Sequence, residues 1–305
     1  MGYPMAGHIA KAFGQHCLVW NRTRARAEQH AAEYGSTAVG MPEELGAAQV
    51  VLLCLPTSDE DAAIAEQIVP RMTPGACLVS CTSGEPVATK ELGKSLRSRF
   101  GVHLVDCPVS GGPRGALAGS LACMMGVDDD ASAELVRPVL ETFSKKLVRC
   151  GPSGAGHAVK AINNALNVTH LLLGAEGLIA LSKLGVDPAV ALEAINGSSG
   201  RSMQTEQRLP QEVLTGRFGY GFKLPLMAKD CRIAAGILGS TFPEASLLPQ
   251  AMEMVQRAAG EESESADYTN VVKLLERQTG VELRAGKIAM TTDEGPPAKR
   301  ARPKL

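Results

Sequence analysis

A row of amine and amide side chains inside an otherwise apolar segment is the feature of this sequence that could most directly do chemistry. In GPSGAGHAVKAINNALNVTHLLLGAEG, Lys160, Asn163, Asn164 and Asn167 recur at spacings of three and four, on one face of a helix. A solvent-facing strip has the same spacing, but the apolar flanks favour a polar notch in a buried helix, where these groups need partners. Because burial lowers the pKa of a lysine toward neutrality, we expect Lys160 to protonate a developing alkoxide as a general acid.

Two further segments carry candidate groups. In DCPVSGGPRGALAGSLACMMG, Ser110, Gly111 and Gly112 follow a predicted strand, and open α/β sheets bind ligands at the carboxyl ends of their strands. Their N–H groups and one hydroxyl could hold a carboxylate, although such a run more often forms only a turn. In GFKLPLMAKDCRIAAG, Lys229 lies beside Asp230 on a predicted helix, a pair that by itself is typical of a protein surface.

The opening segment, MGYPMAGHIAKAFGQHCLVWNRT, has the pattern of the second part of a dinucleotide-binding βαβ unit. We expect a helix at Met5–Phe13 and a strand at His16–Trp20, ending at Asn21. A full unit begins with a strand and a G-x-G-x-x-G turn that lets the backbone approach the pyrophosphate. Only Gly2 remains as a counterpart, so the first strand is missing, and we expect a truncated gene model or an alternative start. Loss of that central strand should leave its neighbours' edges unpaired.

The end of this strand also bears on the choice of cofactor. NAD enzymes place a carboxylate there for the ribose hydroxyl, whereas NADP enzymes replace it and supply arginine. The chain has Asn21, Arg22 and Thr23, and a guanidinium can form a forked pair with a 2′-phosphate. We therefore expect NADP, with NAD possible. The alternative is a solvated helix start with Thr23 as its N-cap.

Short β-rich runs alternate with helical stretches in the first half, which is typical of a parallel sheet covered on both faces. The closer spacing of the later runs predicts that the sheet ends with an antiparallel portion. We expect helices that include Thr23–Tyr34 and Glu85–Arg97, and strands at His16–Asn21, Gln49–Pro56, Ala76–Thr82, His103–Val109, Ser120–Val127 and Lys146–Gly151.

After Gly156 the strand signal disappears. A long apolar helix is expected at His157–Leu184, stopped by Gly185, and such a helix must be buried between domains or subunits. Further helices are expected at Pro188–Asn196, Pro225–Leu238, Leu247–Ala259 and Tyr268–Gln278.

The predicted fold class is therefore α/β. A Rossmann-like NADP-binding domain without its first strand is expected over residues 1–153. An all-helical domain for substrate binding and dimerisation should follow over residues 154–283. Residues 284–305 are rich in Pro, Lys and Arg and are expected to form a disordered basic tail.

Composition limits the partners. The 305 residues carry a net charge of −1, with 45% hydrophobic and 21% charged residues, which gives no electrostatic reason to expect nucleic acid or an anionic membrane. We expect no membrane span, because no apolar run reaches about 18 residues, and no signal peptide. The eight cysteines fall singly in apolar runs without a CxxC pair, so we expect buried thiols in a reducing compartment and no metal site.

Taken together, these segments resemble the β-hydroxyacid dehydrogenase family, which includes 3-hydroxyisobutyrate dehydrogenase, tartronate semialdehyde reductase and glyoxylate/succinic semialdehyde reductase. The resemblance covers about Met1 to Gln278 and is carried by MGYPMA, VWNRT, DCPVSGGPRGALAGSL, GPSGAGHAVKAINN, INGSSGRSM and FGYGFKLPLMAKD. It implies that Lys160 is the catalytic acid/base and that Asn164 helps to hold a substrate whose carboxylate binds Ser110, Gly111 and Gly112. It further implies that the cofactor is bound by Gly2, Met5, Asn21, Arg22, Thr23, Leu55, Pro56, Thr82, Phe222, Lys229 and Asp230, with Thr82 beside the nicotinamide.

The expected function is hydride transfer between NADP(H) and a small 3-hydroxy acid or semialdehyde acid, and the NRT variant resembles the NADPH-using semialdehyde reductases. We expect a homo-oligomer of two or four chains. The missing strand and the basic tail motivate an alternative, a catalytically impaired relative that acts as a scaffold or binding protein. An imine reductase is disfavoured, because the proton donor here is a lysine with an asparagine partner.

The compartment stays open at the level of the sequence. A soluble intracellular protein of the cytoplasm or of an organelle, such as the mitochondrion, is expected. The tail PPAKRARPKL could be a nuclear signal, and Pro303-Lys304-Leu305 is an imperfect peroxisomal tripeptide. A solvated tail that no targeting receptor recognises is favoured over either signal.

Overall fold

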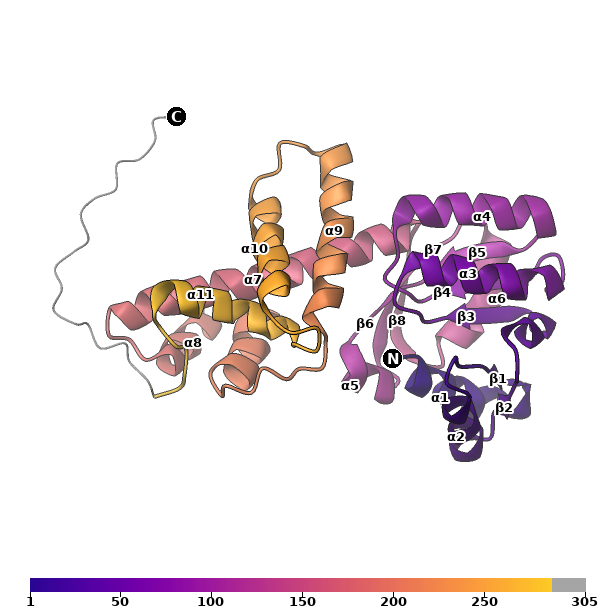
Figure 1. Ribbon diagram of the computed structural model, residues 1–305, viewed down its shortest axis with the longest axis horizontal. Helices are drawn as coiled ribbons and strands as arrows, with labels where there is room; N and C mark the ends of the chain where they lie inside the picture. Colours follow the sequence, from indigo (N-terminus) through magenta and orange to yellow (C-terminus); the bar gives the residue numbers. More distant parts are fainter. Residues whose placement is uncertain (287–305) are drawn as a thin grey trace. The chain divides into compact units, whose positions relative to one another are not determined.

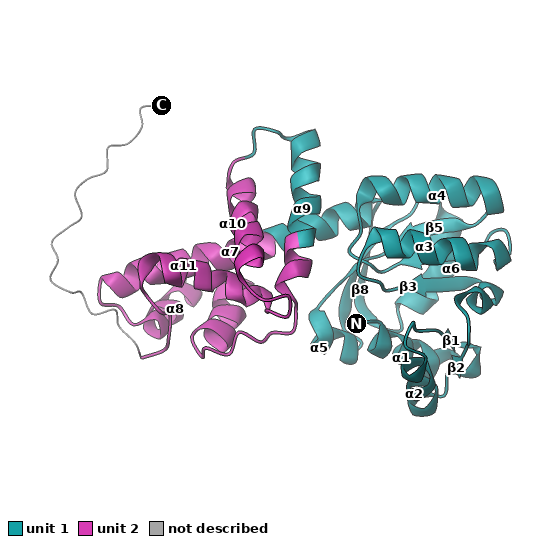
Figure 2. Ribbon diagram, in the orientation of Figure 1, with its two compact units in different colours: residues 1–165, 229–245 teal, residues 166–228, 246–305 magenta. Residues whose placement is uncertain are grey.

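The computed structural model describes residues 1–286 of the chain. Most of the predicted basic tail, from residue 287 on, therefore lies outside the described residues. Figure 1 shows the element order, and Figure 2 shows that the chain forms two compact units. Unit 1 comprises Met1–Ala165 and Lys229–Ala245, and unit 2 comprises Leu166–Ala228 and the residues from Ser246 on.

The chain passes between the units at three points, two within continuous helices and one in the loop between α9 and α10. Both α7 (Ala155–Lys183) and α9 (Leu224–Thr241) belong partly to unit 1 and partly to unit 2. The domain boundary expected after residue 153 stays a prediction. The start of α7 is bonded to unit 1, where the amides of Gly154 and His157 donate to the buried Asp106 carboxylate at 2.6 and 2.9 Å.

The core of unit 1 is a six-stranded sheet with the strand order β3-β4-β5-β7-β6, in which β8 also pairs with β7. The first three strands are parallel, while β7 runs antiparallel to β5 and β6, as the spacing of the later strands predicted. Register places Leu53, Ser80 and Asp106 in one row across the sheet. The strands are β3 (Val50–Leu53), β4 (Cys77–Ser80), β5 (His103–Asp106), β6 (Val109–Ser110), β7 (Leu121–Gly126) and β8 (Ser144–Gly151).

Alternate residues of these strands enter two separate cores. Val51, Leu53 and Leu78 pack with apolar residues of α3 and α4 on one face, while Cys77 and Val79 pack with α1, α5 and α6 on the other. This is the pattern of a parallel sheet buried on both faces. The helices of unit 1 are α1 (Gly2–Phe13), α2 (Arg24–Tyr34), α3 (Ser58–Ile68), α4 (Pro86–Phe100), α5 (Gly112–Leu117) and α6 (Asp130–Leu140), with short turns η1 (Gly14–His16), η2 (Pro42–Ala47) and η3 (Val69–Arg71).

The amino-terminal part forms a second, small sheet. β1 (Leu18–Val19) pairs in parallel with β2 (Thr37–Ala38), and neither pairs with the six-stranded sheet. Among residues 1–286, β1 and β3 thus each keep one edge without a strand partner, which is the arrangement expected when no strand lies between them. Helix α1 is held instead by Met5 in the apolar core and by rings of Tyr3, His30 and Tyr34 that join it to α2.

Unit 2 is helical, as predicted, and it also contains a π-helix that was not predicted from the sequence. Residues Gln204–Val213 form a π-helix, η4, which contains Pro210. Proline lacks an N–H and crowds the preceding turn, and a widened turn accommodates it. The predicted helix at Tyr268–Gln278 begins with a 3₁₀ turn, η5 (Tyr268–Asn270). The other helices are α8 (Pro188–Asn196), α10 (Leu247–Glu261) and α11 (Val271–Thr279).

Helix α7 also bears on the membrane question. Within the described residues, α7 is the one helix long and apolar enough to span a bilayer. The sequence predicted no membrane span, because no uninterrupted apolar run reaches about 18 residues. Half of the most apolar window of α7 is buried inside the protein, and the core helix of a globular protein passes the same test. All eight cysteines are free, and six of them are buried.

Candidate active site

The polar face of α7 is buried where it carries Lys160. The side chains of Lys160 and Asn164 lie one turn apart and are only 8% and 6% exposed. At these two residues, the burial confirms the predicted polar notch and excludes the alternative of a solvent-facing strip. Asn163 is half-buried and donates to Asn164 Oδ1 at 3.2 Å. Asn167, the last residue of the predicted row, belongs to unit 2.

Asp230 organises the groups on this face. Its Oδ2 accepts a hydrogen bond from Asn164 Nδ2 at 2.6 Å, and its Oδ1 lies 3.1 Å from Lys229 Nζ in an ion pair. The carboxylate is 1% exposed, so the Lys229–Asp230 pair is not the surface pair that adjacency alone suggested. Asn164 from α7 donates to this buried anion and Lys229 from α9 forms an ion pair with it, so the amide of Asn164 is held in one orientation.

The amine of Lys160 stands apart from these contacts. Within residues 1–286 it forms no hydrogen bond and no ion pair shorter than 4 Å. Burial lowers the pKa of its ammonium, the negative charge of Asp230 opposes that shift, and the positive charge of Lys229 adds to it. An amine of this kind can give up its proton more readily than an exposed lysine, which is the property a general acid requires.

Lys229 connects α9 to the ends of two neighbouring strands. Its Nζ donates to the carbonyl of Pro56, which follows β3, at 3.2 Å, and to the carbonyl of Ser83, which follows β4. Between the same two segments, the Leu55 amide donates to Thr82 Oγ1 at 3.0 Å. The structure therefore brings together four of the predicted cofactor-binding residues, Leu55, Pro56, Thr82 and Lys229.

Asp61 on α3 is a buried acid that sequence reasoning missed. It is 4% exposed and accepts hydrogen bonds from Thr82 Oγ1, at 2.7 Å, and from Ser80 Oγ. Burial raises the pKa of Asp61 to about 6, although both hydroxyls and Lys229 act in the opposite direction. In the sequence, Asp61 follows Asp59 and Glu60 and reads as an ordinary acidic first turn of a helix. The one available signal was its place on the same face as the apolar Ala65 and Ile68.

His157 extends this polar group toward α7. Its Nε2 lies 3.4 Å from Ser80 Oγ, and its Nδ1 lies 2.8 Å from Thr89 Oγ1. Burial, helped by the charge of Lys229, lowers the pKa of His157 to about 4, so the ring is neutral at pH 7. His157 precedes Lys160 by one helical turn and was also not singled out from the sequence.

The structure divides the predicted strand His103–Val109 into β5, which ends at Asp106, and the short strand β6, and it places Gly111 and Gly112 directly after β6. Ser110 ends β6 and pairs with Ala122 of β7, and α5 begins at Gly112. Gly111 and Gly112 have φ values of 135° and 65°, which favour glycine because other side chains are strained there. Within residues 1–286, no hydrogen bond or ion pair joins these three residues to Lys160 or Asp230, so their role as a carboxylate site stays a prediction.

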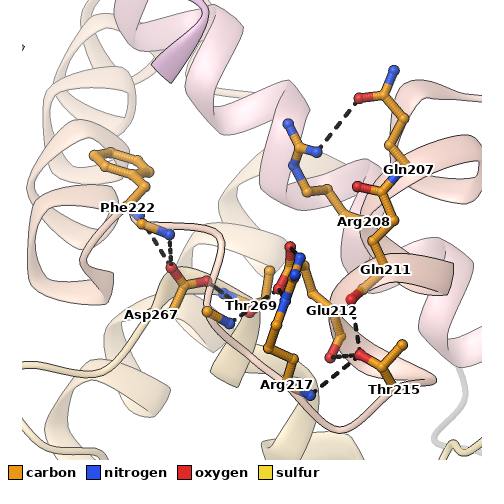
Figure 3. A network of polar contacts seen from close by, with 11 residues as sticks. Gln207, Arg208, Gln211, Glu212, Thr215, Arg217, Phe222, Asp267 and Thr269 are labelled. Atoms are coloured by element: carbon orange, nitrogen blue, oxygen red, sulfur yellow. Dashed lines mark hydrogen bonds and ion pairs between the residues drawn. The ribbon is translucent and has the colours of Figure 1, made fainter. Parts of the chain in front are cut away.

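The other predicted cofactor residues are spread more widely. Asn21, Arg22 and Thr23 follow β1 and are exposed. Asn21 Oδ1 accepts a hydrogen bond from the Thr23 amide at 2.9 Å. The Thr23 side chain forms no capping hydrogen bond to the start of α2. Gly2 begins α1, and a β-carbon there would lie 3.3 Å from Cys54 Cβ. The Met5 side chain belongs to the apolar core. Phe222 lies in unit 2, where its amide donates to Asp267 (Figure 3), and its role as a cofactor contact stays a prediction.

The fold and the site define a class of protein, a nicotinamide-dependent oxidoreductase with a Rossmann-like domain and a helical domain. Two family models match the chain. The NAD-binding domain of 6-phosphogluconate dehydrogenase matches residues 1–151, and the NAD-binding domain of NADP-dependent 3-hydroxyisobutyrate dehydrogenase matches residues 154–275. The chain belongs to the β-hydroxyacid dehydrogenase family.

Individual relatives agree with this assignment. An uncharacterized oxidoreductase of Shewanella frigidimarina is 34% identical over 85% of this chain and 90% of its own length, and the 2-(hydroxymethyl)glutarate dehydrogenase of Eubacterium barkeri is 32% identical over 94% and 95%. The solved Mycobacterium tuberculosis 3-hydroxyisobutyrate dehydrogenase, determined with L-serine, is 26% identical, covers 90% of this chain and 95% of its own, and has a TM-score of 0.80. The protein is an NAD(P)-dependent hydroxyacid dehydrogenase, and the scaffold alternative is not favoured.

Proposed function

We propose that the protein interconverts a small 3-hydroxy acid and its semialdehyde with NADP(H) as cofactor, and that Lys160 is the general acid and base. When bound, the nicotinamide supplies the hydride for reduction and accepts it in oxidation. Lys160 donates a proton to the carbonyl oxygen in the reductive direction and removes the hydroxyl proton in the oxidative direction. Positioning by the surrounding groups provides much of the remaining rate.

The observation that carries this proposal is the burial of an unpaired lysine beside an oriented amide. Lys160 forms no hydrogen bond within residues 1–286, while Asn164, one turn away, is held by Asp230 at 2.6 Å. A buried amine without a partner costs free energy unless a ligand completes its bonding. A substrate oxygen that bonds both Lys160 and Asn164 would supply that partner.

The substrate class follows from the relatives' names. The 2-(hydroxymethyl)glutarate of one relative, and the 3-hydroxyisobutyrate and L-serine named for another, share a CH₂OH group on the carbon next to a carboxylate. We propose the same arrangement for the substrate here. Ser110 and the amides of Gly111 and Gly112 hold its carboxylate, because N–H groups free of side chains suit an anion.

The preference for NADP rests on the end of β1. Asn21, Arg22 and Thr23 offer no carboxylate that would repel a phosphate, and the exposed Arg22 forms no ion pair within residues 1–286. The amides of the first turn of α1 carry the partial positive charge that favours a pyrophosphate. Leu55, Pro56, Thr82 and Lys229 would hold the nicotinamide end, with Phe222 and Asp230 as further contacts.

The direct test is an assay of NADPH oxidation with glyoxylate and with succinic, tartronate and methylmalonate semialdehydes, and of NADP⁺ reduction with the matching hydroxy acids. We expect turnover with at least one substrate that has a carboxylate one carbon from the reacting group. NADPH binding without turnover of any of them would contradict the proposed substrate class. Absence of binding by both NADPH and NADH would contradict the proposed reaction itself.

Replacement of Arg22 tests the cofactor preference. Arg22→Asp removes a charge-assisted bond to the 2′-phosphate and adds a repelling carboxylate, so we expect the ratio of kcat/KM for NADPH over NADH to fall about 10- to 100-fold. Arg71→Asp, an equal charge change at an exposed position, should leave the ratio unchanged. An unchanged ratio in Arg22→Asp would mean that the phosphate is recognised elsewhere.

We also propose that the chain forms a homo-oligomer of two or four copies, in which residues 154–283 act as the substrate and dimerisation domain. Leu166 and Leu173 lie exposed at heptad spacing along α7, and 59% of the surface of Leu173 is accessible. Light scattering measures the mass directly. A particle of one chain's mass, 32.0 kDa, would contradict the proposal.

A further inference from the structure

Asp61 on α3 accepts from the end of β4, at the point where the pairing of β3 with β4 ends. β3 and β4 pair with Leu53 opposite Ser80, and the backbone pairing continues with the Cys81 amide donating to the Leu53 carbonyl at 2.8 Å. Beyond this backbone hydrogen bond, the two strand ends are bonded through a side chain. The Leu55 amide donates to Thr82 Oγ1, and that hydroxyl gives its one proton to Asp61 Oδ1 at 2.7 Å.

The second oxygen of Asp61 is occupied in the same way. Ser80 Oγ donates to Asp61 Oδ2, so two hydroxyls from one strand end point at a single buried carboxylate. If this carboxylate were lost, one or both hydroxyls would lose their acceptor. Thr82 would then be free to rotate, and the Leu55 amide would lose a fixed partner.

Lys229 holds the same two segments from another element. Its ammonium donates to the carbonyls of Pro56 and Ser83, each one residue beyond Leu55 and Thr82. The ends of β3 and β4 are thus bonded twice, once through the Thr82 hydroxyl, which Asp61 holds in place, and once through the Lys229 ammonium. Attraction between these opposite charges supports both contacts.

We propose that Asp61 is a positioning residue for the cofactor, which acts through Thr82 and, together with Lys229, holds the ends of β3 and β4 in the spacing that receives the nicotinamide. This inference rests on the proposed function, because it takes Leu55, Pro56 and Thr82 as the nicotinamide end of the site. Asp61 itself touches neither cofactor nor substrate. Its carboxylate must be ionised to accept from both hydroxyls at once.

This requirement makes cofactor binding dependent on pH. A carboxylic acid has to donate its own proton to one of the two hydroxyls, which reverses that hydrogen bond. The charged and titratable groups that face Asp61 are Lys229 from α9, Glu60 from its own helix, Cys54 after β3, Cys81 after β4, and His157 from α7 through Ser80. Because burial raises the pKa of Asp61 to about 6, the change falls between about pH 5 and 7, while His157 stays neutral there.

The test compares Asp61→Leu and Asp61→Asn with the full-length wild type and with Asp59→Asn. Asp59 lies on the same helix but is exposed, so its variant removes an equal charge outside the contact. Two quantities are measured: the dissociation constant of NADPH from pH 5 to 8 by fluorescence, and the hydrogen-exchange rate of the Leu55 amide without cofactor.

We expect Asp61→Leu to weaken NADPH binding about 10-fold and to raise Leu55 exchange about 10-fold, the loss expected for one hydrogen bond. Asp61→Asn should bind more tightly than Asp61→Leu, because an amide can still serve one hydroxyl as acceptor and the other as donor. Its binding should not weaken from pH 7 to 5 as that of the wild type does. Asp59→Asn should match the wild type in both measurements.

The outcomes separate this inference from the proposed function. If Leu55 exchange rises in Asp61→Leu but NADPH affinity does not change, Asp61 has a structural role only and the proposal is wrong. Equal pH dependence in the wild type and Asp61→Asn would also overturn it. If the wild type binds neither NADPH nor NADH, the proposed function fails first, whatever Leu55 exchange does in the variants.

Discussion

Each compact unit contains a buried cluster of charged side chains, and the two clusters differ in what they leave unsatisfied. In unit 1, the lysine cluster consists of Lys160, Asn164, Lys229 and Asp230. In unit 2, the glutamate cluster is centred on Glu212 (Figure 3), and this residue is 1% exposed. Glu212 accepts from Arg217 through both oxygens and from the Gly219 amide at 3.1 Å. Its carboxylate is saturated, whereas the Lys160 amine has no hydrogen bond within residues 1–286.

The difference extends to the segments that each cluster joins. The partners of Glu212 lie within seven residues of it and enclose Phe218, a non-glycine residue with φ of 46°. The glutamate cluster therefore holds a tight turn in a conformation that is costly for this residue. Asn164 and Asp230 are 66 residues apart. The local glutamate cluster holds a loop, whereas the long-range lysine cluster leaves one amine without a hydrogen bond within residues 1–286, which is what the proposed substrate contact requires.

The largest effect is expected when the Lys160 amine is removed. Lys160→Ala removes the proposed proton donor, so we expect turnover to fall about 10²- to 10⁴-fold, the range for a general acid. The free energy of unfolding should not fall in proportion, because Lys160 makes no hydrogen bond that the variant would lose. Steady-state kinetics and denaturant titration of the same preparation measure both. Near-normal turnover would remove Lys160 from the mechanism.

The next largest effect concerns Asp61, which lies beside the lysine cluster and has an environment that opposes its charge. Its pKa is raised to about 6, so the folded state holds the proton more tightly than the unfolded chain, where the value is about 4. This stabilisation is complete below about pH 4 and is lost as the pH rises through 6. We expect the wild type to lose about 3 kcal/mol of stability between pH 4 and 7.5 that Asp61→Asn does not lose.

Denaturant titrations of both chains across this pH range measure the difference. The pKa of Asp106 is also raised to about 6 by burial, but Asp106 is present in both chains and cancels. Parallel stability curves for the wild type and Asp61→Asn would show that Asp61 does not titrate in this range.

The smallest expected effect comes from the saturated cluster. Glu212→Gln keeps the shape of the side chain but removes its charge, and Arg217 is half-exposed and remains hydrated. We expect a loss of about 1–2 kcal/mol in the free energy of unfolding, with kcat and KM unchanged at temperatures where the variant is folded. A loss of turnover without a loss of stability would show that the glutamate cluster has a role in the reaction.

The sequence by itself determined the local features. The spacing of Lys160 and Asn164 places them on one helical face, because 3.6 residues per turn is a property of any α-helix. The β-rich runs near residues 50, 78 and 104 form strands because apolar and β-branched residues suit a sheet buried on both faces. The resemblance to the β-hydroxyacid dehydrogenases was also visible from ordered motifs and is confirmed by the family models.

Only the tertiary structure decided which of these groups meet. Asp230 appeared to be half of a surface pair until the fold buried it against Asn164, and Asp61 appeared to be one of three acids in a solvated helix start. Hydrogen bonds over 21 to 66 residues depend on how helices pack on the sheet, which no periodicity specifies. The pKa values of Lys160 and Asp61 are shifted for the same reason, since burial acts on a side chain only after the fold has excluded water from it.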